Sequence, residues 1–482
     1  MAHCERSQYH HYIPRFLLYG FVDDTAAASH PVGGLTKTRQ QMKRWEKQNA
    51  EINIINLHDG SLVRRRVAKQ YGLTDMYRDT RATNQHVLEA KLAVLETQVG
   101  TILNNARKAF CHDEGTLMLR RSEKHVPRKF LFLMKYRSSH MYSRFNVTSL
   151  EAYSAGDRAK LGRYMATRGF NTPRDVWLAN LHTFLDLDMG LGNWIENIQR
   201  DAYPDDATMF YLHMQQSYLA FVKPKSPSDE FLLTENAFGI FEGPSSCKVD
   251  VLTGETHLGH WTEWHNFAPV SASLLIVLRS KFLPGGVVKP LQEKRSQMYE
   301  RMLSLHNDEV QAQSILQDLP IEQCKVRYSN GDHLSGFGVA TSTDEYTFRC
   351  FTLESRYVDV INGLFLEEAH KTAAVTYRSG HAAAKAIRAY LETERPGFKF
   401  TLNAESSMPV YLQSLKTALQ HLGGEADVVH TTVTWLFPQA LLLDYINHLA
   451  CAVGEAVAEH ILYADSPTLG SYSSLVGGRG KG

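Results

Sequence analysis

A chain of 482 residues exceeds the size at which one hydrophobic core keeps growing, so we expect two cores or one large domain with an appendage. Its hydrophobic content of 43% and charged content of 21% exclude a largely disordered chain and are typical of a globular protein. The 52 basic residues balance 51 acidic ones, so the net charge of +1 supplies no global field for nucleic acid or an anionic membrane. Nucleic acid stays open as a partner only through a local patch.

The remaining global features point to an intracellular protein. The six cysteines form no CxxC pair, which excludes a zinc knuckle and a dense disulfide framework. The first residues lack the apolar run of a secretory signal, and no stretch reaches the roughly 18 apolar residues of a membrane helix. We therefore expect no membrane partner and a cytoplasmic location, with the nucleus as the alternative.

The chain opens on a dense block of histidine, aromatic and apolar residues, HHYIPRFLLYGF, at residues 10–21. Chain ends usually stay disordered unless something holds them. This block is too apolar to remain in water, so we expect it to be buried. Its burial would carry His10 and His11 into the interior.

A β-hairpin is predicted next, within EINIINLHDGSLVRRRVAK at residues 51–69. The Asp59–Gly60 pair is a hairpin turn signal between two runs of β-forming residues. The basic residues Arg64, Arg65, Arg66 and Lys69 follow the turn. They can hold a phosphate, although such a run on a hairpin is more typical of a solvated face.

The strongest helix of the first half is predicted from residue 85 to residue 110. Apolar residues recur there at steps of three and four, which indicates one buried stripe. Glu89 and Glu96 are seven residues apart, so two turns place them on the same side, beside that stripe. Paired carboxylates at a core margin can bind a divalent cation or transfer protons. The alternative is that each one only meets a basic partner.

A second helix is predicted over residues 126–144, and Arg137 and Arg144 lie near its end. Either arginine is a natural counter-ion for Glu89 or Glu96, because a guanidinium can bind a carboxylate through two hydrogen bonds. Another helix is predicted at residues 207–221.

A polar triplet follows a short predicted strand at residues 231–233. The triplet is Thr234, Glu235 and Asn236. Polar residues at the tip of a buried strand commonly line a site, whereas Thr or Asn there can simply satisfy the backbone of a turn. A second buried strand, LLIVL at residues 274–278, is expected beside the first.

Several of these pieces together resemble a family known only as a domain of unknown function. They are the opening block, the helix with two glutamates seven apart, the KYRSSH segment, the TEN triplet and APVSASLLIVL. The N-terminal signature of that family reads HxY, Val or Ile, Pro, then FxLxxF, and the resemblance spans roughly residues 8–280. The family's triplet is typically Thr-Ser-Asp-Asn-Pro, so Glu235 and Ala237 depart from it. The resemblance implies a fold and recurring positions, not an activity.

Composition changes after residue 285, where helices are predicted at 291–305, 357–379, 382–393, 409–422 and 438–463, with a β-hairpin over 326–351. We predict a mainly helical α+β fold, with a central small mixed sheet, packed helices and a C-terminal helical extension. The expected division is a core domain at 1–285 with the candidate polar site, a mainly helical extension at 286–465, and a Gly-rich disordered tail at 466–482.

Two hypotheses share one set of candidate residues: His10, His11, Glu89, Glu96, Arg137, Glu235 and Asn236. In the first, the histidines and glutamates hold Mn, Mg or Zn, an arginine holds a phosphate, and the protein is a metal-dependent hydrolase of phosphodiesters. In the second, these residues form a buried structural network in an interaction or scaffold protein, whose C-terminal helices bind a protein partner. Convergence on one solvent-reachable spot would favour the first hypothesis, and histidines sealed by separate partners would favour the second.

Overall fold

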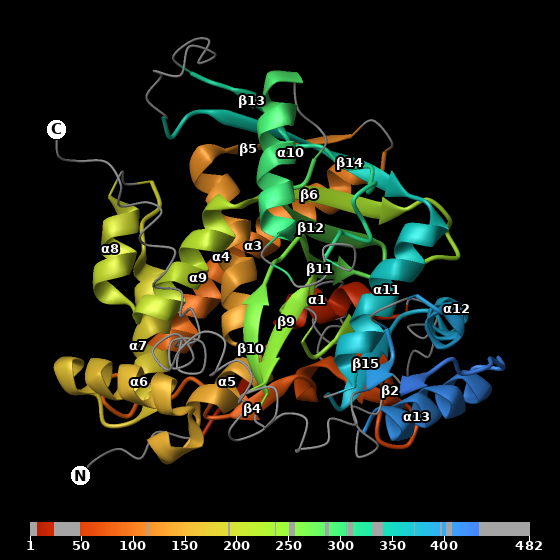
Figure 1. Cartoon of the computed structure of the whole chain (residues 1–482), viewed down its shortest axis with the longest axis horizontal. Coiled ribbons are helices and arrows are strands. Elements are labelled where there is room, and N and C mark those ends of the chain that lie inside the picture. The colour runs from red at the N-terminus through yellow and green to blue at the C-terminus, as the bar shows by residue number, and fades with distance from the viewer. Residues whose placement is uncertain are drawn as a thin grey trace, which may run out of the picture.

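The chain forms an α+β structure in which sheets separate two groups of helices (Figure 1). The computed structural model describes residues 7–23, 49–112, 115–190, 193–236, 238–249, 256–284, 289–304, 306, 312–329, 341–370, 372–395, 398–401 and 407–432. None of the helices within these ranges is both long and apolar enough to cross a bilayer.

The larger sheet has seven strands, so the expectation of a small central sheet was wrong. It is mixed, as predicted, because β14 runs parallel to β6 while the other pairs are antiparallel. Its strands in sheet order are β13 (Lys325–Arg327), β14 (Glu345–Leu353), β6 (Ser217–Pro224), β12 (Leu274–Ser280), β11 (His265–Ser271) and β8 (Phe241–Glu242), with β5 (Thr116–Arg120) also paired to β14.

Both faces of the central strands are covered, which explains their continuous apolar runs. Along β12, Leu274, Ile276 and Leu278 pack into one hydrophobic cluster, whereas Leu275 and Val277 pack into another. The period of two follows from the strand geometry. The sheet therefore divides the two cores that the chain length predicted.

A four-stranded antiparallel sheet lies beside the N-terminal segment. Its order is β3 (Leu62–Arg66), β2 (Glu51–Asn56), β15 (Ala374–Tyr377) and β7 (Leu233–Thr234). The predicted hairpin is confirmed as β2 and β3, with Gly60 at φ 73° in its turn. The strand at 233–234 pairs with β15, so its expected place beside 274–278 was wrong.

Helices cover the sheets on two sides. In Figure 1, α6 to α9 gather on the left of the sheets and α11 to α13 on the right. The helices are α3 (Val87–Phe110), α4 (Arg121–Tyr136), α5 (Ser139–Phe145), α6 (Ala155–Arg168), α7 (Pro173–Asp186), α8 (Trp194–Asp201), α9 (Pro204–Gln215), α10 (Lys289–Leu303), α11 (Ser355–Ala369), α12 (Gly380–Glu392) and α13 (Met408–His421). The shorter elements η4 (Leu150–Ala152), β9 (Ser245–Val249), β10 (Thr256–Trp261), β16 (Phe400–Thr401) and β17 (Thr431–Thr432) complete the set.

Three helix predictions need correction. The helix expected over 357–379 ends at Ala369, and the residues Ala374–Tyr377 form β15. The helix expected over 126–144 is two helices, because the Ser138 side chain accepts a hydrogen bond from the amide of Met141 and starts α5 anew. The helix expected over 207–221 ends at Gln215, and the apolar residues after it form β6.

The chain after residue 285 does more than add helices. β13 and β14 form the predicted antiparallel pair, and β14 and β15 pair with strands from the first half of the chain. Strands from the expected C-terminal extension therefore belong to both sheets: β14 lies between β13 and β6, and β15 lies between β2 and β7. The helix predicted at 438–463 and the tail predicted at 466–482 lie outside the described residues.

The opening block is buried, as predicted. It forms β1 (Tyr9–His11), α1 (Arg15–Leu18) and η1 (Tyr19–Phe21), and its apolar side chains enter the first core. Leu17, Leu18 and Phe21 are fully buried. Gly20 crosses β11 so closely that an added Cβ would lie 2.7 Å from the Cβ of Ser271.

Candidate functional site

Backbone hydrogen bonds hold the opening segment on both sides of its two histidines. β1 pairs antiparallel with β4 (Gly72–Thr74). The amides of Tyr12 and Ile13 then donate to the carbonyl of Tyr71 at 2.9 and 3.4 Å. Because successive side chains of a strand face opposite ways, His10 is buried, with 1% exposed, and His11 is half-buried.

His10 carries a buried hydrogen-bond donor that lacks an acceptor. The backbone N–H of Tyr77 donates to His10 Nδ1 at 3.0 Å, and the two rings stack with their centroids 5.4 Å apart. Burial lowers the pKa of His10, and the nearby His86 lowers it further. A neutral imidazole that accepts at Nδ1 carries its proton on Nε2. Within the described residues, His10 Nε2 has no hydrogen-bond partner.

His11 is oriented as a base. Its Nδ1 lies 2.9 Å from the carbonyl oxygen of Gln70, which can only accept, so the proton sits on Nδ1. Burial lowers the pKa of His11, and the positive charges of Arg15 and Arg137 lower it further. The Nε2 lone pair is therefore available near neutral pH, and the backbone contact fixes the ring.

Helix α3 presents the two glutamates as predicted. Leu88, Leu92 and Leu95 are buried along its apolar stripe, and Glu89 and Glu96 are half-buried at its margin. Burial raises the pKa of Glu89, and the negative charge of Glu96 raises it further. A half-buried carboxyl group with a raised pKa, such as that of Glu89, is suited to the role of proton donor.

Arg137 lies directly after α4 and meets Glu96. Its Nη2 donates to Glu96 Oε1 at 2.7 Å, and only 1% of the Arg137 side chain is exposed. Although burial lowers the pKa of Arg137, the adjacent Tyr77, Glu96 and Glu89 raise it above its ordinary value. The predicted arginine–glutamate pair is thus confirmed for Arg137. It is wrong for Arg144, whose guanidinium lies over the ring of Phe145, 5.5 Å from its centroid.

Two further buried atoms lie near this ion pair, the hydroxyl of Tyr77 and Nε of Arg137. Neither has a well-aligned hydrogen bond among the described residues, but the Tyr77 hydroxyl lies against the Arg137 side chain, within reach of a hydrogen bond from it. Burial raises the pKa of Tyr77, which keeps the hydroxyl protonated, and the charge of Arg137 lies close to it. We refer to the residues linked through Arg137 and Tyr77 as the His–Glu–Arg cluster; His10 joins it through its stacking on Tyr77. It consists of His10, His11, Tyr77, Glu89, Glu96 and Arg137.

Sequence reasoning missed Tyr77, His86 and Arg15. His86 stands three residues before Glu89, at helical spacing, so it was within reach of the periodicity argument. Arg15 lies within the opening block at residues 10–21, but the prediction for that block rested only on its histidine, aromatic and apolar residues. Tyr77 carries no local signal, because its place beside His10 depends on the pairing of β1 with β4.

Glu235 and Asn236 lie apart from the cluster, on the turn after β7. Glu235 accepts hydrogen bonds from the Tyr12 hydroxyl at 3.3 Å and from the backbone amide of Ala373 at 3.2 Å. Asn236 accepts from the Thr234 hydroxyl and donates to a backbone carbonyl of α11. Neither has a hydrogen bond or ion pair to a cluster residue within the described ranges. Their hydrogen bonds tie the turn to Tyr12, Ala373 and α11, and their part in a site stays a prediction.

Metal binding by His10 and His11 stays a prediction. Among the described residues, no three side chains of His, Cys, Asp or Glu are grouped so that they could hold a metal ion. The atoms left without partners here are donors, on His10 and Arg137, and donors repel a cation. We therefore assign no step to a metal.

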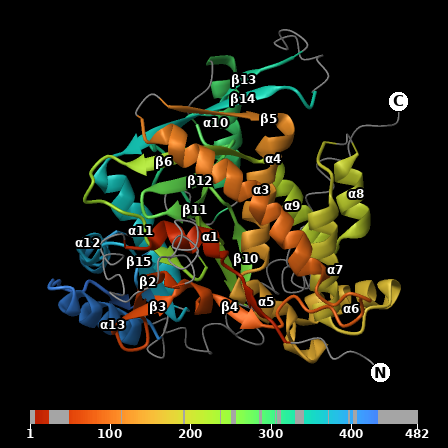
Figure 2. The same ribbon diagram turned by 180° about the vertical axis from the view of Figure 1, so that it is seen from behind.

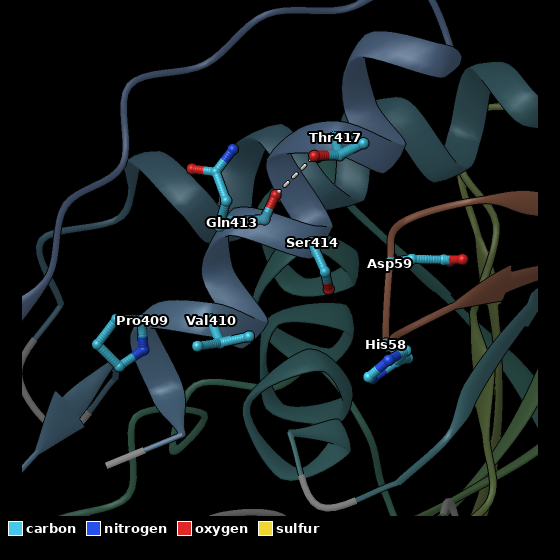
Figure 3. A pocket seen from close by; sticks show the side chains of 7 residues that line it. All are labelled: His58, Asp59, Pro409, Val410, Gln413, Ser414 and Thr417. Atoms are coloured by element: carbon cyan, nitrogen blue, oxygen red, sulfur yellow. Dashed lines mark hydrogen bonds between the residues drawn. The ribbon is translucent and has the colours of Figure 1, made fainter. Parts of the chain in front are cut away.

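A separate hollow of about 460 Å³ lies between the β2–β3 turn and α13 (Figure 3). Two of its polar groups already have partners: the Ser414 hydroxyl donates to the carbonyl of Leu57 at 2.8 Å, and Asp59 Oδ1 accepts from Ser61. Val410 at its rim is 69% exposed. His58 and Gln413 also line the hollow, but no buried ion pair like that of Arg137 and Glu96 is among its described lining residues, so the cluster remains the stronger candidate.

Comparison with known proteins identifies a family for this chain and nothing more specific. No curated protein and no solved structure matches the sequence. One family model matches residues 9–380, which include the opening segment, α3, Arg137 and every strand of the four-stranded sheet. The chain therefore belongs to the family described as Protein of unknown function (DUF4238).

Proposed function

We propose that the protein is a hydrolase that cleaves a phosphodiester at the His–Glu–Arg cluster without a metal. The observation that carries the proposal is the buried N–H of His10 Nε2, which has no acceptor among the described residues, together with the buried positive charge of Arg137. Buried donors are normally satisfied, so an unsatisfied one calls for an acceptor-rich ligand. The non-bridging oxygens of a phosphodiester supply such acceptors and carry the negative charge that Arg137 attracts.

The other cluster residues supply proton transfer. His11 Nε2 takes a proton from a water molecule as the water oxygen bonds to phosphorus. The bond from phosphorus to the leaving oxygen then breaks, and that oxygen takes a proton from Glu89, whose raised pKa favours the protonated form. Glu96 holds the Arg137 guanidinium in place through the 2.7 Å hydrogen bond. Atoms and charges balance, because His11 gains one proton and Glu89 loses one.

A second candidate is the structural network, in which the same residues only fix the opening segment. The Arg137–Glu96 pair and the His11–Gln70 contact support it, because each satisfies a buried or half-buried polar group. His10 and His11 also meet separate partners, the backbone of Tyr77 and that of Gln70, and separate partners are the arrangement that favours this hypothesis. Under this alternative the protein has no hydrolytic activity, and removal of a cluster side chain affects stability alone.

The test is metal-free hydrolysis of bis(p-nitrophenyl) phosphate, with EDTA present, by wild type, His11→Gln and Glu89→Gln. The control is His140→Gln, which removes an exposed histidine of α5. We expect turnover by wild type and the control, and a loss of about 10² to 10⁴-fold in each cluster variant. No turnover by wild type, or equal turnover by His11→Gln, would overturn the proposal. Lower stability of the variants without any wild-type activity would establish the structural alternative.

A further inference from the structure

Strand β3 is an outer strand of the four-stranded sheet and carries three consecutive arginines. The sheet order places β3 at one end, beside β2 only. Arg64, Arg65 and Arg66 are all exposed, and Lys69 is exposed one turn later in η3 (Val67–Lys69). Figure 2 shows β3 next to β2 and below α1. The chain as a whole is nearly neutral, so this is a local concentration of positive charge.

Most of this charge is uncompensated. Arg64 meets Glu51 at 3.7 Å, with half of the arginine side chain exposed, which makes a weak surface pair. Arg65, Arg66 and Lys69 have no carboxylate partner among the residues that the structure describes. At least three cations thus remain available to an anionic partner.

The charge continues from β3 toward the His–Glu–Arg cluster. η3 packs against α1, whose Arg15 is exposed and whose charge acts on His11. The carbonyl of Lys69 accepts the Tyr9 hydroxyl at 3.2 Å, and the next carbonyl, of Gln70, accepts from His11. The same short stretch of backbone therefore carries the end of the basic run and orients the base of the cluster.

An exposed aromatic ring lies between them. Tyr9 is 44% exposed and meets His11 edge-on, with ring centroids 5.1 Å apart. An aromatic face among cations is the combination that binds single-stranded nucleic acid, because bases stack on the ring and phosphates meet the cations. Charged residues that only protected a sheet edge would stop at β3, whereas here they continue through Lys69 to Arg15.

We propose that β3, η3 and α1 form a binding surface for single-stranded nucleic acid, and that it leads the phosphodiester backbone to the His–Glu–Arg cluster. Arg65 and Arg66 point to opposite faces of β3 and contact phosphates from the two sides of its outer edge. Lys69 and Arg15 contact further phosphates, and Tyr9 stacks on a base. The inference rests on the proposed function for the role of the cluster, but binding itself requires no hydrolysis.

The test is fluorescence anisotropy with a labelled oligo-dT of about 16 nucleotides, a length that matches single-strand site sizes. The protein variants are wild type, Arg65→Gln/Arg66→Gln and the control Lys325→Gln/Arg349→Gln, which removes two exposed cations from strands of the other sheet. At about 50 mM salt we expect the first double variant to bind about tenfold more weakly and its salt slope to fall by about 1.4, at about 0.7 per lost phosphate contact. The control should bind as wild type does.

Three results would overturn the inference. They are no binding to wild type, unchanged binding by Arg65→Gln/Arg66→Gln, and equal binding of a methylphosphonate oligo-dT without backbone charge. Equal competition by poly-glutamate would assign the surface to an acidic protein instead. Glu89→Gln separates the two proposals: it should keep oligonucleotide binding while losing hydrolysis. If the wild-type protein binds the oligonucleotide but hydrolyses no diester, the binding surface is supported and the hydrolase proposal is rejected. If it hydrolyses the small diester but does not bind the oligonucleotide, the hydrolase proposal is supported and the binding surface is rejected.

Discussion

Replacement of Glu96 by glutamine should expose the cost of burying Arg137. The guanidinium is 1% exposed and its Nη2 lies 2.7 Å from Glu96 Oε1. Glutamine keeps an oxygen acceptor at nearly the same place, so the change removes the charge of the carboxylate and little of its shape. The variant thus measures the electrostatic part of the pair.

The magnitude follows from the position of the pair. Two unit charges about 4 Å apart interact by about 4 kcal/mol at an effective dielectric constant of about 20. The Glu96 side chain is 26% exposed, so solvent screens part of this interaction. Glu89 remains near Arg137 and takes over part of the compensation. We expect a loss of about 2 to 3 kcal/mol in the free energy of unfolding, below the range for fully buried pairs.

Urea denaturation of Glu96→Gln, Arg137→Met and the double variant measures this loss. The double-mutant cycle should give a coupling energy of about 2 kcal/mol, because the two single variants break the same contact. The control is Glu196→Gln, an exposed glutamate of α8, which should change stability by less than about 0.5 kcal/mol. If Glu96→Gln were as stable as that control, the ion pair would not organise the cluster.

Two other predictions concern the frame around the cluster. Gly20→Ala should destabilise the protein by about 1 to 3 kcal/mol, since the new Cβ would lie 2.7 Å from the Cβ of Ser271. The control Gly156→Ala should not destabilise it, because the added Cβ meets open space. Equal losses of unfolding free energy in urea denaturation would contradict the close approach of Gly20 to β11. Burial raises the pKa of Asp206 from 3.8 to about 6, so the folded state binds the proton of this carboxyl group more tightly than the unfolded chain does. The protonated carboxyl group therefore stabilises the folded state. This stabilisation is complete below about pH 4 and is lost as the pH rises through 6. Asp206→Asn still offers an oxygen to the Tyr136 hydroxyl and should become more stable than wild type by roughly 3 kcal/mol at pH 7.5, with no such advantage at pH 4; parallel pH profiles of unfolding free energy would refute this.

Local periodicity predicted the elements whose stabilising contacts are close in sequence. The apolar spacing in α3 predicted both the helix and the position of Glu89 and Glu96 at the half-buried margin of its apolar face. The Asp59–Gly60 turn gave the hairpin of β2 and β3. Apolar density alone gave the burial of the opening block. In each case the deciding signal is a spacing or a composition that one segment contains.

Nonlocal pairing decided what the sequence did not predict. The apolar run at 217–224 suits a helix or a strand by composition, and it is a strand because β12 and β14, from distant parts of the chain, pair with it. Glu235 follows β7, whose partner β15 lies about 140 residues later, so no local rule could place it beside Tyr12 instead of the cluster. The orphaned donors on His10 and Arg137 likewise appear only when the two segments meet.

Binding of a phosphodiester by those donors is the central claim, and dimethyl phosphate tests it most directly. Long-range ¹H–¹⁵N NMR of the histidine rings reports on the Nε2 proton of His10 as this small diester is added. The account predicts a saturable downfield shift of that proton and a smaller change at His11, while the exposed His140 stays unchanged. Arg137→Met should weaken the binding. A His10 signal that never responds, or one that moves only in step with His140, would contradict the claim that the His–Glu–Arg cluster is a phosphodiester site.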